Sequence, residues 1–102
     1  MDALTNEINL IKEQIVSLYN PSKIILFGSQ AKGTATIKSD IDLCVVKDTE
    51  NKQELLADMY LNIESSKPFD LLLYTEAEWN QCVNDTTSFA YLIDKKGTVI
   101  YG

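Results

Sequence analysis

The chain has 102 residues, of which 45% are hydrophobic and 24% charged, and these values predict one ordinary globular domain spanning 1–102. It contains no histidine, which excludes Ser-His-Asp and Cys-His catalysis, histidine metal ligands and histidine pH switches. Its 9 basic and 15 acidic residues give a net charge of −6. This charge argues against direct binding of nucleic acid, because the neutralisation of phosphates dominates that affinity.

The cysteines and the apolar segments bear on the cellular compartment. Cys44 lies in an apolar run and Cys82 in a predicted helix, with no spacing typical of a metal site. We expect both to be reduced, which favours a cytoplasmic protein. No stretch resembles a signal peptide, and no apolar run approaches the roughly 20 residues that a membrane span needs, so we expect no membrane association.

In the first half of the chain, apolar spacing predicts one helix followed by two strands. The helix covers 2–19, where apolar residues recur at steps of four and three, and Asn20-Pro21 ends it. The apolar positions of this helix are Leu4, Ile8, Ile11, Ile15 and Leu18. Residues 23–27 and 41–46 are short, continuous apolar runs, as is typical of strands buried on both faces.

In the second half, a helix over 50–66 with an apolar stripe precedes a third strand at 69–74. The stripe consists of Leu55, Leu56, Met59, Tyr60 and Ile63. Thr75 and Glu78 form a capping-box pattern that opens another helix, and a further helix ends near Gly97. Residues 98–101 predict a final strand at a sheet edge.

The order of elements predicts an α/β domain of two layers, a small mixed β-sheet with helices packed on it. The strands at 41–46 and 69–74 are joined by a helix, so we expect them to be parallel. The gap between the first two strands is too short for a parallel crossover and favours an antiparallel pair. The end of the first strand and the beginnings of the other two therefore meet at one edge.

Three aspartates lie at that edge. Asp40 and Asp42 alternate along a strand and so share a face, while Ile41 and its alternate neighbours point into the core. Two fixed carboxylates repel one another unless a cation lies between them, and oxygen ligands favour Mg²⁺. Asp70 begins the parallel strand and is expected to complete a metal cluster or to act as a base.

A phosphate-binding turn is predicted to face these acids. Gly28 ends the first strand and allows the backbone to approach a ligand closely. Ser29 and the amides after it are expected to open a short helix whose N–H groups point at an anion, and Lys32 adds a positive charge. A phosphate cradle opposite a carboxylate trio suits phosphoryl or nucleotidyl transfer assisted by two cations.

These residues resemble a known family. Gly28-Ser29, ten intervening residues and Asp40-Ile41-Asp42 are similar to the signature of the DNA polymerase beta-like nucleotidyltransferase superfamily. The longer string from Phe27 to Gly33, followed by residues 39–43, is similar to its minimal nucleotidyltransferases, the MNT family, although that family more often has Arg where this chain has Lys32. The resemblance covers nearly the whole chain.

The resemblance implies a nucleotidyltransferase fold, two Mg²⁺ ions held by Asp40, Asp42 and Asp70, and ATP as donor, with Gly28, Ser29 and Lys32 binding the nucleotide. It also implies a partner, a HEPN-domain RNase toxin. The chain would be its antitoxin and would add AMP to a tyrosine hydroxyl of the toxin.

Two alternatives to this enzyme stay open. The chain could neutralise its partner by occlusion without catalysis, or it could modify a small molecule such as an aminoglycoside. Because the sequence holds only the catalytic core, we expect the acceptor surface to come from another chain or from self-association as a homodimer.

Overall fold

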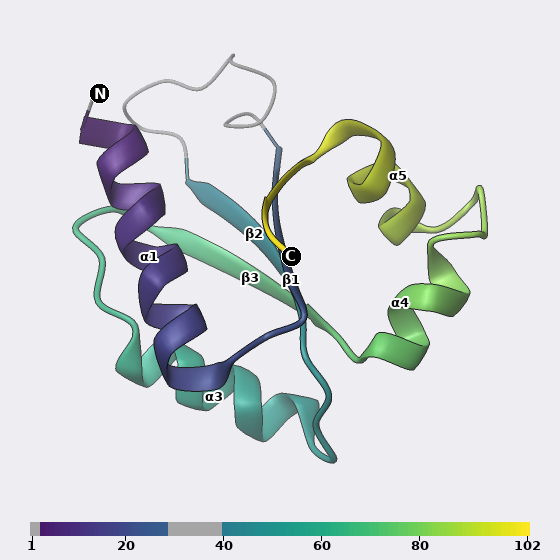
Figure 1. The fold of residues 1–102 in the computed structure, drawn as a ribbon, viewed down its shortest axis with the longest axis horizontal. Coiled ribbons are helices and arrows are strands. Elements are labelled where there is room, and N and C mark those ends of the chain that lie inside the picture. The colour runs from purple at the N-terminus through teal and green to yellow at the C-terminus, as the bar shows by residue number, and fades with distance from the viewer. Residues whose placement is uncertain (1–2, 29–39) are drawn as a thin grey trace.

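The computed structural model describes residues 3–28 and 40–102, which form a four-stranded sheet with helices against it (Figure 1). The elements of the first half are α1 (Ala3–Tyr19), β1 (Lys23–Phe27), β2 (Ile41–Val46) and α3 (Lys52–Asn62). Those of the second half are β3 (Phe69–Tyr74), α4 (Glu76–Cys82), α5 (Phe89–Lys96) and β4 (Thr98–Tyr101). The strands lie where the apolar runs predicted them.

The sheet is mixed and has the strand order β3-β2-β1-β4. β1 pairs antiparallel with β2 and with β4, and β2 pairs parallel with β3. All three predictions on strand pairing are therefore confirmed, including the place of β4 at an edge. The connections decided the first two pairings, since β2 and β3 are joined through the helix α3, whereas the segment between β1 and β2 is too short for a parallel crossover.

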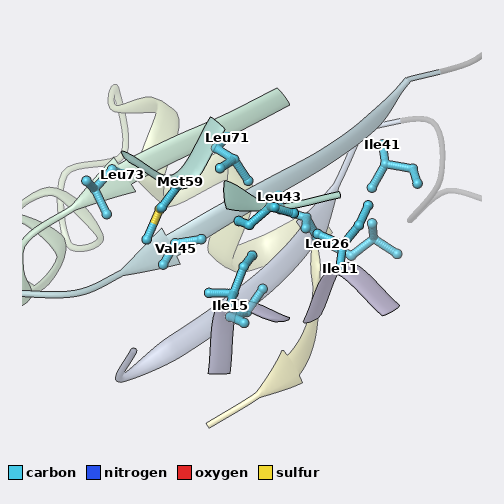
Figure 2. Close-up of a cluster of buried hydrophobic side chains, with 11 residues drawn as sticks. Ile11, Ile15, Leu26, Ile41, Leu43, Val45, Met59, Leu71 and Leu73 are labelled. Carbon is cyan, nitrogen blue, oxygen red and sulfur yellow. The ribbon is translucent and has the colours of Figure 1, made fainter. Parts of the chain in front are cut away.

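Helices cover both faces of the sheet, so the prediction of two layers was wrong. α1 and α3 lie on one side, and α4 and α5 lie on the other (Figure 1). The first core, shown in Figure 2, joins Ile11 and Ile15 of α1 and Met59 of α3 to the sheet. The second core joins Trp79 of α4 and Ala90 and Ile93 of α5 to its opposite face. Strands buried on both faces need a cover on each side, which explains the third layer.

Helix boundaries follow local capping chemistry. α3 is shorter than predicted at both ends. The Asn51 side chain accepts a hydrogen bond from the Glu54 N–H and begins the helix, and Ile63, which donates its N–H to the Met59 carbonyl, ends it. The predicted capping box at the start of α4 is present between Thr75 and Glu78. Gly97 ends α5 and donates its N–H to the Ile93 carbonyl, as predicted.

Leu18 departs from its predicted place, because the residue is 56% exposed and lies off the buried face of α1. Ile11 and Ile15, which were also predicted for that face, are buried in the core. The cysteines Cys44 and Cys82 are free thiols, as expected, and burial raises the pKa of Cys44 to about 12, so this thiol is inert. No helix within the described ranges is both long and apolar enough to span a membrane.

Candidate functional site

Asp42 and Asp70 lie side by side at one edge of the sheet. They occupy paired positions on the parallel strands β2 and β3. Because side chains alternate along a strand, both point to the face on which Cys44 and Leu72 pack, the face covered by α4 and α5. The prediction that parallel pairing brings Asp70 to the edge occupied by Asp42 is confirmed.

The Asp42 carboxyl is the electrostatic focus of this edge. Partial burial raises its pKa, and the nearby charges of Asp70 and Asp40 raise it further. Asp40 lies just before β2 and is exposed, whereas Asp42 is half-buried. Three carboxylates are thus near enough to interact, and the innermost one holds its proton more tightly than a free aspartate does.

Gly28 lies directly against Asp42. Antiparallel pairing sets Phe27 opposite Asp42, and the chain then turns at Gly28 with a φ of 77°, a conformation that favours glycine. A Cβ atom built on Gly28 would lie 2.5 Å from Oδ2 of Asp42. The predicted sharp turn at this glycine is therefore confirmed, and the missing side chain leaves the carboxylate room. The close approach of this backbone to a ligand stays a prediction.

The acids offer the oxygen donors that Mg²⁺ prefers, so Asp42 and Asp70 fit the part of ligands. Within residues 3–28 and 40–102, however, no three Asp, Glu or Cys side chains are grouped so that they could hold a metal ion. The assignment of Asp40, Asp42 and Asp70 as a three-ligand metal site thus stays a prediction. Ser29 and Lys32, the remainder of the predicted phosphate cradle, lie outside the described residues.

Contacts from two neighbouring elements fix the start of β3, which carries Asp70. The Leu71 N–H donates to the Tyr60 hydroxyl oxygen of α3 at 2.7 Å, and the Tyr60 and Phe69 rings stack with centroids 5.5 Å apart. The Ile41 N–H donates to the Pro68 carbonyl at 3.0 Å. The sequence predicted Tyr60 only as a member of the apolar stripe of α3. Its position eleven residues before Leu71 carries no signal for this contact.

A small apolar cavity lies beside Gly28, between the end of β1 and α5, and sequence reasoning did not find it. Its volume is about 320 Å³. The cavity is lined by Phe27, Gly28, Phe89, Leu92, Ile93, Lys96 and Gly97. The sequence carries only a weak signal for this cavity, because the apolar residues of a short helix such as α5 predict a packed core element whether or not they are exposed.

Comparison with known proteins agrees with this geometry. The profile of the nucleotidyltransferase domain family matches residues 8–92, which span α1 to α5. A crystal structure of a Sulfolobus solfataricus protein assigned as a nucleotidyltransferase is similar in fold, with a TM-score of 0.58 and 23% identity over 76% of this chain and 74% of that one. No curated protein sequence matches significantly. The matched segment contains β1, β2 and β3 with their glycine and aspartates, and the chain therefore belongs to the nucleotidyltransferase domain family.

Proposed function

We propose that the protein is a Mg²⁺-dependent adenylyltransferase that moves AMP from ATP to a hydroxyl group. The observation that carries the proposal is the pairing of Asp42 with Asp70 on one sheet face, with Gly28 against the Asp42 carboxylate. Membership of the nucleotidyltransferase domain family supports the reaction class.

In the proposed reaction the acceptor oxygen bonds to the α-phosphorus of ATP, the bond from that phosphorus to the bridging oxygen breaks, and pyrophosphate leaves. Asp42 and Asp70 would hold the cation, with Asp40 beside them. Mg²⁺, when bound, would lower the pKa of the acceptor hydroxyl and neutralise phosphate charge. Asp70, which is exposed, would take the hydroxyl proton, and Gly28, which has no side chain, would let the phosphates approach the sheet edge.

The proposed acceptor is a tyrosine of a HEPN-domain RNase toxin, which makes this protein the antitoxin. The support is the resemblance of the segment from Phe27 to Leu43 to minimal nucleotidyltransferases. The net charge of −6 agrees with a protein acceptor rather than a nucleic acid.

The test is to purify the chain together with its cognate HEPN protein and to weigh both intact. We expect ATP with Mg²⁺ to add the mass of one or more AMP units to the HEPN protein. Asp42→Asn abolishes the gain, whereas Asp94→Asn, which changes an exposed aspartate of α5, leaves it unchanged. An unmodified partner in the presence of active wild-type protein refutes the protein-acceptor assignment.

Occlusion without catalysis predicts a different result for the same variants. If binding alone neutralises the toxin, cells expressing the toxin survive equally well with Asp42→Asn and with wild type. We expect Asp42→Asn to bind the partner and to fail in rescue. Modification of a small molecule instead would show as AMP transfer to an aminoglycoside with the HEPN protein left out.

A further inference from the structure

The cavity beside Gly28 combines apolar walls with the positive charge of Lys96. Among the described residues that line it, none is acidic and one, Lys96, is basic, in a chain whose net charge is −6. Its volume of about 320 Å³ falls at the lower end of the range for small-ligand sites. The lining therefore suits a small, flat, uncharged group attached to an anion.

Two aromatic rings form one wall of the cavity. Phe27 and Phe89 lie with ring centroids 5.7 Å apart and planes at 87°, an edge-to-face pair. Phe89 is 52% exposed and Leu92, one turn further along α5, is 47% exposed. With the rings perpendicular, a planar ligand can stack on one ring and meet the edge of the other.

Gly28 connects the cavity to the acidic edge of the sheet. The same glycine lines the cavity and lies against Oδ2 of Asp42. A ligand that spans Gly28 would have one end near the carboxylates and the other between Phe89 and Leu92. A nucleotide has this build, because its phosphates need a cation and its base is flat and apolar on its faces.

We infer that this cavity binds the nucleobase of the donor nucleoside triphosphate, an inference that rests on the proposed function. Phe89 and Phe27 supply the stacking surface, Leu92 closes the side, and Lys96 stands at the rim as a hydrogen-bond donor or phosphate partner. Among the described lining residues, Lys96 is the one charged donor beside the stacking rings, so we expect this wall to distinguish bases by their stacking area rather than by their hydrogen-bonding edges. Purine triphosphates therefore bind more tightly than pyrimidine triphosphates.

The experiment compares ATP with inorganic tripolyphosphate, which has no base, by calorimetry in the presence of Mg²⁺. Phe89→Leu keeps an apolar side chain and removes the ring. We expect it to weaken ATP about five- to tenfold, since stacking on an aromatic side chain is worth this much or more. Tripolyphosphate affinity changes less than about twofold, because its contacts lie on the acidic side of Gly28.

Leu92→Ala and Leu61→Ala form a matched pair for this experiment. Both replace an exposed leucine on a helix, but Leu61 lies on α3 and is 84% exposed. We expect Leu92→Ala to weaken ATP and Leu61→Ala to leave it unchanged. Unaltered thermal unfolding of Phe89→Leu and Leu92→Ala shows that their folds are intact.

Three results overturn the inference. If Phe89→Leu and Leu92→Ala leave ATP affinity unchanged, the base lies elsewhere, and the proposed function still stands. If these variants instead dissociate a dimer seen by sedimentation, the cavity is an interface between copies. If wild type takes up neither ATP nor tripolyphosphate, the inference and the proposed function both fail. Base-dependent ATP binding without AMP transfer supports the cavity assignment and refutes only the function.

Discussion

The Asp42 carboxylate opposes folding at neutral pH. Burial, Asp70 and Asp40 all disfavour its charged form, so its pKa lies above the ordinary value of 3.8. A folded state that binds a proton more tightly than the unfolded state is most stable at low pH. The contribution of this group to stability is therefore gained as the pH falls through the raised pKa towards 3.8, and it is lost as the pH rises.

Asp42→Asn removes this unfavourable negative charge, so we expect the cation-free variant to be more stable than wild type at pH 7. Because the carboxylate is partly solvated, the gain is small, a rise in Tm of about 1–4 °C for a domain of this size. Thermal unfolding followed by circular dichroism in the presence of a chelator measures it. AMP transfer is lost in the same variant.

The control for this prediction is Asp94→Asn, which removes one negative charge from the exposed surface of α5. It reports the effect of net charge alone, and we expect a smaller change in Tm. Added Mg²⁺ should raise the Tm of wild type and leave that of Asp42→Asn unchanged, since ligand binding to the folded state stabilises it. A variant less stable than wild type at pH 7 contradicts the interpretation of Asp42.

Gly28→Ala tests the close approach of the backbone to Asp42. An alanine here must adopt a φ of 77° and place its Cβ 2.5 Å from Oδ2 of Asp42. We expect a loss of about 1–3 kcal/mol in the free energy of unfolding, together with loss of nucleotide binding. In an Asp42→Ala background the steric part disappears, so the same substitution costs less by about 1 kcal/mol. Equal losses in both backgrounds, measured by denaturant unfolding, would mean that backbone strain alone is responsible.

At the scale of elements, α1 holds the segment that leads into β3. The Gln14 side chain donates to the Glu64 carbonyl at 2.7 Å and accepts from the Glu64 N–H at 2.8 Å. Nearer the start of α1, Oε1 of Glu7 accepts hydrogen bonds from the hydroxyls of Ser65 and Ser66, each at 2.9 Å, and from the Ser66 N–H. These contacts fix the chain just before Asp70 and so help to position the acidic edge.

Glu7→Gln weakens this attachment in a pH-dependent way. The hydrogen bonds from Ser66 and Ser65 lower the pKa of Glu7 below its ordinary value of 4.5. A carboxyl group whose pKa is lowered by folding stabilises the folded state above pH 4.5. This stabilisation is lost as the pH falls through the lowered pKa. At pH 7 we expect the variant to lose about 1 kcal/mol, since the site is partly screened by solvent.

Urea unfolding of wild type and Glu7→Gln between pH 3 and pH 7 checks this prediction. The difference between them should shrink below pH 4.5. Glu13→Gln, on the same helix and exposed, is the control and should show no such convergence. A pH-independent difference for Glu7→Gln would mean that the hydrogen bonds do not depend on the charge of the carboxylate.

The strands and their pairing were predictable because each depends on a short stretch of sequence. A run such as 41–46 is apolar on both faces, and the length of a connection decides whether two strands can be parallel. The meeting of Asp42, Asp70 and Gly28 follows from those two facts. The contacts of Tyr60, Glu7 and Gln14 were not predictable, because their partners are many residues away and exposed polar side chains carry no spacing pattern.

At the scale of the whole molecule, one sheet separates two hydrophobic cores. This arrangement could not be predicted from the sequence. The apolar positions of α4 and α5 are few, and Phe89 and Leu92 of α5 are each about half exposed, so the pattern does not predict which face of the sheet these helices cover. Only the double-sided burial of β1 and β2 required helices on the second face of the sheet, and so a third layer. Leu43 of β2 faces the core under α1 and α3, and the next residue, Cys44, faces the core under α4 and α5.

The shared sheet predicts that the two cores unfold together. Leu43→Ala opens a cavity in the core opposite to Trp79, the only tryptophan, which is 5% exposed and belongs to the other core. We expect a loss of about 2–5 kcal/mol, whereas Leu61→Ala at the surface changes stability by less than about 0.5 kcal/mol. Because β2 contributes side chains to both cores, tryptophan fluorescence and far-ultraviolet circular dichroism should shift by the same amount in denaturant. A fluorescence transition that stays at its wild-type midpoint would show that the layer of α4 and α5 unfolds independently of the layer of α1 and α3.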